Sequence, residues 1–303
     1  MSNFEEKFTD GNYIFRYRKA SNNDILALEK NRLYFSTPQN FNDPYDNRIY
    51  ADTKKIKNNV RNNIEGNMDQ YLEDFRLIDP IAGSIAYALW NSNQGKGMIT
   101  GFQSHVGETV NLVKESVRAN AKVICFSEVY NAMLMWSHYA NDHKGFLLVF
   151  SKKQIKEAEC FSLEGVEIAN KVRLEKVDYV TEQMDLSEDV EDYVRYEMMP
   201  TMGDVEKRNG KIGQTKLRMF VSQKSKEWEE EREWRLMPRT IDLQEPSPLG
   251  FIKCVPAALV LGTYCDKKDS ERIIAIAKNT GIPMFRMVLD DSDPTFKLKV
   301  IDI

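Results

Sequence analysis

Eight consecutive residues, from Met135 to Asp142, gather side chains that could bind a polar ligand. A Trp, a Ser, a His and a Tyr follow one another at positions 136 to 139, between two apolar segments that have the character of buried strands. A core helix does not need so many hydrogen-bonding side chains, whereas a cleft that holds a flat polar ligand does. The segment therefore predicts the place of a binding site more clearly than it predicts a reaction.

On a helix, Trp136 and Tyr139 would share one face, while Met135, His138 and Asp142 would share another. Core packing is the simplest interpretation of Trp136 taken alone. For His138 and Tyr139, core packing and ligand contact stay equally open. A tyrosine can stack on a flat ring and still hydrogen bond through its hydroxyl group, which favours Tyr139 as a ligand-binding residue.

A second group of candidates is acidic and lies at residues 226–236. If this segment is a helix, Glu231 and Arg235 form an ordinary surface pair. If a strand begins at Glu231, then Glu231, Glu233 and Arg235 line one face of it. Two carboxylates that lie so close repel each other, which raises the pKa of one of them and suits the pair to catalysis. A solvated run of charges is the alternative.

Two arginines form a third group of candidates. Residues 13–18 alternate as a strand does, so Arg16 and Arg18 point to the same side. Planar guanidinium groups hold phosphates through paired hydrogen bonds, and two of them would suit a diphosphate. Arginines that are simply solvated on an exposed strand are an equally good interpretation.

A fourth group, Phe41 to Pro44, has the composition of a turn, in which Asn and Asp bond their own backbone and Pro fixes the next dihedral angle. A chain-positioning turn is the simpler interpretation. A functional loop at the rim of a cleft, with Asn42 and Asp43 facing the ligand, is the alternative.

These residues need a scaffold, and the periodicity of the sequence predicts an α+β protein. Expected strands cover residues 13–18, 33–37, 122–127, 145–150, 172–180, 257–261, 283–289 and 296–301. Expected helices cover residues 21–31, 152–159, 187–223 with breaks at Pro200 and at 210–213, and 270–279 closed by Gly281. Residues 47–120 read as a helical insertion that is interrupted at Asp79-Pro80 and at 92–97.

The composition of the chain favours a soluble globular protein and argues against a protein that binds duplex DNA or a membrane. Among 303 residues, 42% are hydrophobic and 29% are charged, so we expect a soluble globular chain. The net charge of −4 argues against a basic surface for duplex DNA. The acidic N-terminus lacks the apolar core of a signal peptide, and no apolar run has the length of a membrane helix. We therefore expect a cytoplasmic protein without a membrane partner.

Known chemical motifs are scarce in this chain. The four cysteines are far apart, so they form neither a zinc motif nor a disulfide framework, and with three histidines no metal site is expected. The sequence also lacks the spacing of a phosphate-binding loop, of a nucleophile elbow and of the dinucleotide glycine fingerprint. Serine hydrolases and doubly wound oxidoreductases therefore receive no support.

Taken in order, several segments resemble a large bacterial family whose domain has no known function and is often encoded near mobile elements and defence genes. These segments are Tyr13–Arg18, Leu33–Ser36, Phe41–Pro44, Cys125–Glu128, Met135–Ala140 with Gly145-Phe146, and Trp228 followed by Glu231, Glu233, Trp234 and Arg235. The resemblance covers most of the chain outside the insertion at 47–120. It names no reaction.

More distantly, the layout resembles the ADP-ribosyltransferase superfamily. That resemblance implies NAD as the substrate that supplies the ADP-ribose, an arginine at the position of Arg16 or Arg18, a nicotinamide contact at Ser127 or Tyr139, and a catalytic glutamate at Glu231 or Glu233. The chain departs from the superfamily in lacking a His-Gly-Thr signature and a clear Ser-Thr-Ser strand, of which Ser36-Thr37-Pro38 is only reminiscent. The full set of implied catalytic residues is Glu233, Glu231, Tyr139 and His138. The implied NAD-binding residues are Arg16, Arg18, Ser36, Asn42, Asp43, Ser127 and Trp136.

The resemblance implies one domain, residues 1–303, built on a split mixed or antiparallel sheet of the ADP-ribosyltransferase type. It implies a toxin or anti-phage effector that modifies nucleic acid or protein and that has an antitoxin or defence-system partner. Two other functions remain open. One is a metal-dependent nuclease that uses Glu231, Glu233, His138 and Asp43. The other is a non-catalytic module that binds a nucleotide or a partner protein.

Overall fold

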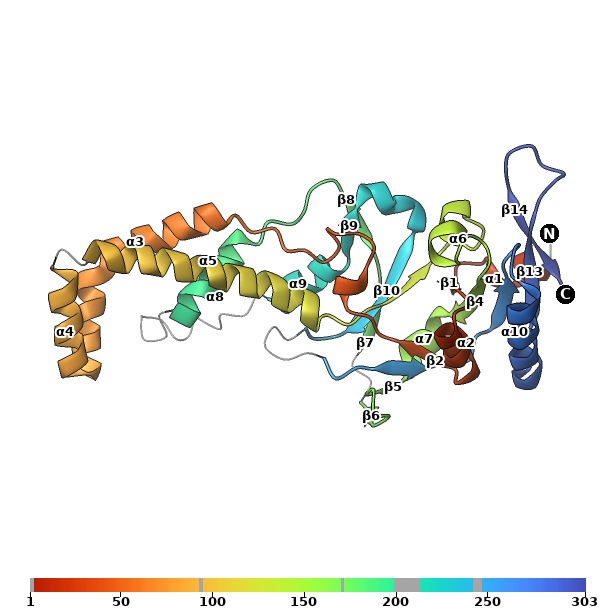
Figure 1. Ribbon diagram of the computed structural model, residues 1–303, viewed down its shortest axis with the longest axis horizontal. Helices are drawn as coiled ribbons and strands as arrows, with labels where there is room; N and C mark the ends of the chain where they lie inside the picture. The colour runs from red at the N-terminus through yellow and green to blue at the C-terminus, as the bar shows by residue number, and fades with distance from the viewer. Residues whose placement is uncertain (1–2, 93–94, 170–171, 199–212, 242–246) are drawn as a thin grey trace.

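The protein consists of a sheet-based body and a long helical arm, as Figure 1 shows. The computed structural model describes residues 3–92, 95–169, 172–198, 213–241 and 247–303. The expected helix break at Pro200, most of the break expected at 210–213 and positions 93–94 of the loop expected at 92–97 lie outside the described residues.

The body is built around an eight-stranded sheet in which β12 and β13 are parallel and the other neighbours are antiparallel. In sheet order, the strands are β14 (Leu298–Asp302), β13 (Met284–Leu289), β12 (Ala258–Leu261), β4 (Phe146–Ser151), β1 (Tyr13–Arg18), β3 (Ile124–Ser127), β10 (Glu233–Pro238) and β7 (Val172–Lys176). The expected α+β class and mixed sheet are confirmed.

The large sheet splits between β1 and β3. Strand β1 pairs with β4 along its whole length. In the described chain, β1 shares with β3 the single pair of Phe15 and Ser127. Strand β3 instead pairs along its whole length with β10, where Ser127 also lies opposite Glu233. The two halves of the sheet therefore diverge beside Phe15, and side chains from both halves can face the space between them.

Helices cover both faces of the half-sheet that contains β4. Side chains of α2 (Asn22–Glu29), α7 (Lys152–Glu157) and α10 (Lys267–Thr280) pack on one face with Phe146, Leu148 and Phe150. Side chains of α1 (Asn3–Phe8) and α6 (Met133–Tyr139) pack on the other face with Leu147 and Val149. Because successive strand residues point to opposite faces, β4 is apolar and buried from Phe146 to Phe150, as expected for a strand covered on both sides.

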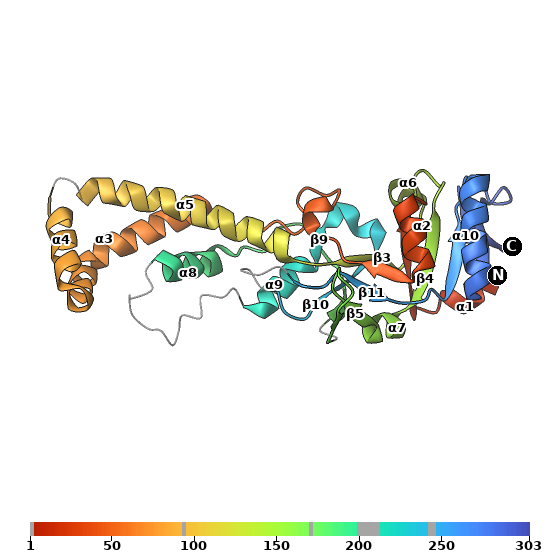
Figure 2. The ribbon, with the colours of Figure 1, turned by 60° about the horizontal axis from the view of Figure 1, so that its bottom comes forward.

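The arm consists of α3 (Thr53–Ile78), α4 (Pro80–Trp90) and α5 (Gly95–Asn120), with α8 (Ser187–Met198) beside them (Figures 1 and 2). Helix α3 buries a stripe at four-residue spacing, namely Ile56, Val60, Ile64, Met68 and Leu72. This stripe packs against valines of α5 and continues to the base of the arm, where α9 (Gln214–Val221) joins the same core. The expected helices in 47–120 are confirmed from Thr53 onward, and Asp79 caps α4 as Pro80 begins it.

Short strands complete the body. A four-stranded sheet is formed, in order, by β2 (Arg32–Tyr34), β11 (Phe251–Lys253), β5 (Glu159–Phe161) and β6 (Glu167–Ile168). The expected strand 172–180 is instead two strands, because the chain leaves β10 after β7. Its second part, β8 (Asp178–Val180), pairs in parallel with β9 (Gln223–Ser225). Gly281, in the left-handed region at φ 70°, ends α10 as expected.

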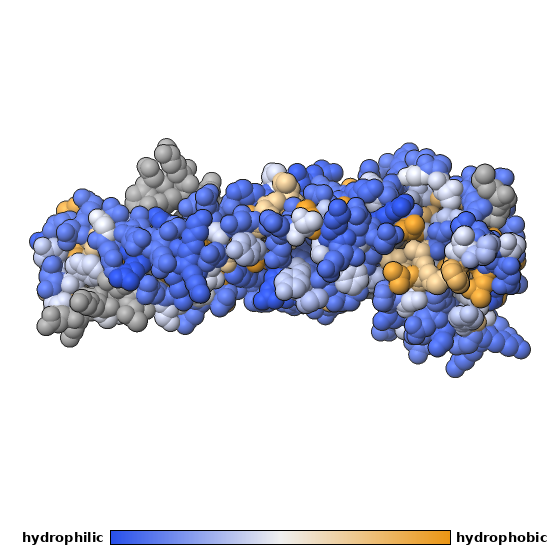
Figure 3. Space-filling model, turned by 90° about the horizontal axis from the view of Figure 1, so that it is seen from above, coloured by the Kyte–Doolittle hydropathy of each residue, from blue (hydrophilic) through white to orange (hydrophobic). Residues whose placement is uncertain are grey.

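The face of the molecule in Figure 3 is mostly hydrophilic, and hydrophobic side chains gather on it toward the end of the body opposite the arm. Along the described residues, no helix combines the length and the apolar character needed to cross a membrane.

A close approach at Gly145 gives a test of how the half-sheets are assembled. A methyl group on Gly145 would lie 1.9 Å from the carbonyl oxygen of Arg18, where β1 ends. We expect Gly145→Ala to lower the free energy of unfolding by about 1–3 kcal/mol, because backbone atoms must shift to admit the methyl group. Denaturant unfolding followed by circular dichroism measures this change.

The matched control is Gly66→Ala on α3, where an added methyl group meets no atom within 4 Å. Alanine favours the helix over glycine, so this variant should be more stable by about 0.5–1 kcal/mol. A Gly145→Ala protein that unfolds at the parent's denaturant midpoint would contradict the described packing.

Candidate functional site

A cavity of about 450 Å³ lies where the sheet splits, and its size suits a small-molecule ligand. Side chains from five segments line it. They are Arg16 and Arg18 of β1, then Ser36, Asn42 and Asp46 of the segment that follows β2, then Ser127 at the end of β3, His138 and Tyr139 of α6, and finally Lys224, Glu231 and Glu233 of residues 224–233. The cationic, aromatic and acidic candidates, which are far apart in the sequence, therefore meet around one cavity.

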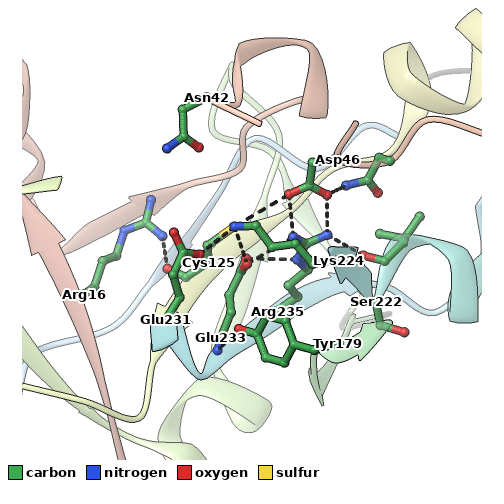
Figure 4. Close-up of polar contacts among 12 residues, drawn as sticks. Arg16, Asn42, Asp46, Cys125, Tyr179, Ser222, Lys224, Glu231, Glu233 and Arg235 are labelled. Atoms are coloured by element: carbon green, nitrogen blue, oxygen red, sulfur yellow. Dashed lines mark hydrogen bonds and ion pairs between the residues drawn. The ribbon is translucent and has the colours of Figure 1, made fainter. Parts of the chain in front are cut away.

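The buried side chain of Arg235 links two of the acidic residues that line the cavity, Asp46 and Glu233. Arg235 is 0% exposed, and its two terminal nitrogens donate to both carboxylate oxygens of Asp46 at 2.9 and 2.6 Å. Its Nε donates to Glu233 at 2.9 Å, and its Nη1 also donates to the Val221 carbonyl at 2.7 Å. Figure 4 shows this arrangement. One guanidinium group thus ties β10 to the segment that follows β2 and to the end of α9.

A buried lysine extends the network toward the cavity. Lys224 of β9 donates to Glu231 Oε2 at 2.5 Å and to Glu233 Oε2 at 3.2 Å. Burial opposes the ionisation of Glu233, but the charges of Arg235 and Lys224 outweigh it and lower the pKa of Glu233 to about 2. The expectation that mutual repulsion raises a pKa is wrong for Glu233, because two buried cations lie beside it.

Glu231 reaches the cavity by a route that the sequence pattern did not predict. Residues Lys226–Glu231 form a short 3-10 helix, η2, and Arg232 then adopts a left-handed conformation at φ 44°. Strand β10 therefore begins at Glu233 and not at Glu231, which corrects the predicted start. Ser127 supports this turn, since its Oγ donates to the Glu231 carbonyl at 2.6 Å.

Tyr139 links α6 to Glu231 at the end of η2. Its hydroxyl group donates to Glu231 Oε1 at 2.6 Å and accepts from Asn42 Nδ2 at 3.0 Å. Burial, together with the negative charge of Glu231, raises the pKa of the Tyr139 hydroxyl well above its ordinary value. The phenol therefore stays protonated at neutral pH and acts as a hydrogen-bond donor to Glu231.

Arg16 supplies a cation that forms no ion pair with an acidic side chain within the described part of the chain. Its terminal nitrogen donates to the Cys125 carbonyl at 2.6 Å, and its Nε is buried without a hydrogen-bond partner. Burial and the nearby Arg18 lower its pKa to about 9, so Arg16 remains charged at neutral pH. Arg18, by contrast, forms an ion pair with Asp24. Both arginines are partly buried, so the interpretation of solvated surface arginines is wrong.

Two predicted ligand-binding residues lie away from the cavity lining. Trp136 is 0% exposed, packs edge-on against Tyr17 and donates from its indole nitrogen to the Tyr130 carbonyl. It is a core residue, because its helix turns this face toward the sheet. Asp43 is buried in the turn after Asn42, where one of its oxygens accepts from the Tyr45 backbone nitrogen. Asp43 shapes the loop that presents Asn42.

The remaining candidates lie around the cavity with different degrees of access. His138 is exposed on α6, next to Tyr139, whereas Ser36 is partly buried at the start of the segment that follows β2. Sequence reasoning missed Lys224 and Asp46. Lys224 lies in a run of polar residues after a helix, and Asp46 lies in a segment with the composition of a turn. Neither pattern indicates that the charged side chain is buried, because the side chains that it contacts are far away in the sequence.

The site does not resemble a preformed metal centre. Within the residues that the structure describes, no group of three or more His, Cys, Asp or Glu side chains is arranged to hold a metal ion. The carboxylates of Asp46, Glu231 and Glu233 instead have Lys224 and Arg235 as cationic partners.

The arrangement around Arg235 predicts its contribution to stability. Arg235→Met should lower the free energy of unfolding by about 3–5 kcal/mol, because it leaves the carboxylates of Asp46 and Glu233 buried with less positive charge. Arg61→Met on the arm is the matched control. It breaks an exposed pair with Glu65 and should cost less than about 1 kcal/mol. Equal effects of the two substitutions in denaturant unfolding would count against the described network.

Comparisons with known proteins match one region of the chain, which supplies part of this site. A family model described as a protein of unknown function (DUF2971) matches residues 135–236. The match begins in the aromatic helix α6 and ends in β10, so it includes Tyr139, Lys224, Glu231, Glu233 and Arg235. Searches of curated proteins and of solved structures returned no match. From residue 135 to residue 236, the chain is therefore similar to a family whose function is unknown.

Proposed function

We propose that this protein cleaves NAD and transfers its ADP-ribose to an acceptor. The observation that carries the proposal is the separation of charge around one cavity. Arg16 provides a cation without a carboxylate partner, while Glu231 provides a carboxylate held by Tyr139. NAD has a matching polarity, since its diphosphate is anionic and its nicotinamide ring carries a positive charge. In Figure 4, Arg16, Asn42 and Glu231 lie on the same side of the buried network.

The proposed reaction breaks the bond between the ribose carbon and the nicotinamide nitrogen. The bonding electrons leave with the ring and neutralise it, and positive charge develops on the ribose. A carboxylate beside the ribose stabilises that charge, and Glu231 has this role in the proposal. Tyr139 stacks on the leaving ring while its hydroxyl group orients Glu231. An acceptor nucleophile then bonds to the ribose carbon and releases its proton.

Arg16 binds the diphosphate in this proposal. A partly buried guanidinium that forms no ion pair gains hydrogen bonds and a compensating charge when a phosphate oxygen approaches its terminal nitrogens. Arg18 is less available, because Asp24 already neutralises it. Asn42 and Ser36 line the same cavity and provide neutral hydrogen-bonding groups for the sugar hydroxyls.

The two other functions have weaker support. A nuclease that uses Glu231, Glu233, His138 and Asp43 would need these side chains around a divalent cation, but Asp43 lies away from the cavity lining and Lys224 bonds both glutamates. A non-catalytic nucleotide-binding module would use the same contacts with Arg16 and Tyr139. Calorimetric binding of NAD without release of nicotinamide would favour that module over the transferase.

We extend the proposal to a toxin or anti-phage effector with nucleic acid or protein as the acceptor and with an antitoxin or defence-system partner. Incubation of the protein with labelled NAD and cell extract, followed by separate digestion with nuclease and with protease, distinguishes the two classes of acceptor. Label that survives protease and is lost with nuclease identifies nucleic acid.

Glu231→Gln tests the proposed charge stabilisation. The substitution keeps the size of the side chain and removes its charge, so release of nicotinamide should fall by about 100- to 1000-fold. Glu230→Gln, which changes an exposed neighbour in η2, is the matched control and should keep the parent's rate. The measurement is nicotinamide release by chromatography, and equal rates for the Glu231→Gln and parent proteins would refute the role of Glu231.

Arg16→Gln tests the proposed diphosphate contact. It removes the cation that lacks a carboxylate partner, so the dissociation constant of NAD should rise at least tenfold, or by about 1.4 kcal/mol in binding free energy. Arg61→Gln, on the surface of the arm, should leave the dissociation constant unchanged. Titration calorimetry measures both. Unchanged binding to the Arg16→Gln protein would place the diphosphate elsewhere.

A further inference from the structure

Lys224 lines the cavity as a buried cation and has no role in the proposed reaction. It is 6% exposed, and its ammonium group lies 2.5 Å from Glu231, 3.2 Å from Glu233 and 4.0 Å from Asp46. The ring of Trp228 lies 4.9 Å from the ammonium nitrogen and contributes a cation–π contact. The lysine is thus enclosed by three acids and one aromatic ring.

The chemistry of this environment excludes a nucleophilic role. Burial favours the neutral amine, but the charges of Glu233 and Glu231 outweigh burial and raise the pKa of Lys224 well above its ordinary value. The amine therefore carries a proton at neutral pH, and its lone pair is not free to attack a substrate. A protonated lysine can act only through its charge and its hydrogen bonds.

The acidic partners of Lys224 differ in whether they also bond a second cation. Asp46 and Glu233 have a second cation, because Arg235 donates to both of them. Glu231 differs, since its side chain bonds Lys224 and the Tyr139 hydroxyl group, and Lys224 is its single cationic partner in the described chain. Removal of Lys224 would therefore leave Asp46 and Glu233 paired with Arg235, whereas Glu231 would keep only the Tyr139 hydroxyl group and would lose its cationic partner.

We infer that Lys224 is a positioning residue, which fixes the Glu231 carboxylate, and through it the Tyr139 hydroxyl group, in the orientation that meets the ribose. This inference rests on the proposed function. The network of Asp46, Glu233, Arg235, Lys224 and Glu231 holds three carboxylates and two cations, so one negative charge remains for the substrate. Glu231, at the cavity end of the network, presents that charge with both of its oxygens already oriented.

Lys224→Met tests the inference through a change in kcat without a matching change in KM. Misplacement of a reacting group by about 1 Å costs on the order of a hundredfold in rate, so kcat for nicotinamide release should fall by about that factor. The KM for NAD should stay within about threefold, because Arg16 and the rest of the cavity are unchanged. Lys226→Met, two residues away and exposed, is the matched control and should keep the parent's kcat.

A double substitution shows whether Lys224 acts through Glu231. The Lys224→Met and Glu231→Gln changes combined should be no slower than Glu231→Gln alone, because the group that Lys224 orients is already disabled. Lys224→Arg, which keeps the positive charge, should retain at least a tenth of the parent's kcat. If Lys224→Met does not fold, as judged by circular dichroism, Lys224→Arg carries the test, and a kcat well below a tenth of the parent's would overturn the inference.

Three results would overturn the inference. They are a Lys224→Met kcat within twofold of the parent, a double variant that is slower by the product of the single effects, and a Lys224→Arg protein as slow as Lys224→Met. The activity of the parent protein on NAD shows whether the inference alone fails or whether the proposed function fails as well. A parent that does not consume NAD overturns the proposed function and this inference together, whereas an active parent with an equally active Lys224→Met protein overturns the inference alone.

Discussion

The paired hydrogen bonds between Arg235 and Asp46 are the constraint on which the rest of the site depends. A fully buried guanidinium is costly unless carboxylates surround it, and these carboxylates come from the segment after β2 and from β10 itself. Satisfying this one cation therefore brings the Asn42 loop against the acidic strand. The loop then reaches Tyr139, and the cavity closes around groups that no local propensity would bring together.

The split of the sheet explains why a cavity exists at this place. Strands β1 and β3 share one residue pair, so the backbone of β1 turns away and leaves Arg16 facing the cavity beside the Cys125 carbonyl. An intact ladder at this position would fill the space with strand pairing and leave no room for a ligand. The single pair of Phe15 and Ser127 keeps the two halves in contact, while Ser127 also supports the turn that carries Glu231.

Local patterns in the sequence predicted the parts of this structure that depend on local rules. The strand at residues 13–18, the helices within residues 47–120 and the end of a helix at Gly281 each follow from side-chain periodicity or backbone freedom, and each is confirmed. The burial of Lys224 and Asp46 depends on partners far along the chain, which no window of sequence contains. The start of β10 at Glu233 depends on the left-handed Arg232, a conformation that arginine rarely adopts, so periodicity alone placed the strand two residues early.

The arm is more than an appendage, because its apolar stripe runs without interruption into the half-sheet that bears the acidic residues. Val221 and Met237 of the body belong to the same buried cluster as Ile56 and Val117 of the arm. Shortening the arm at its outer end would leave this cluster intact, whereas removing the part of the arm next to the body would expose Val221 and Met237 to solvent. Changes in length are therefore tolerable at the tip and damaging at the base, which makes the outer turns the natural place for variation among related chains.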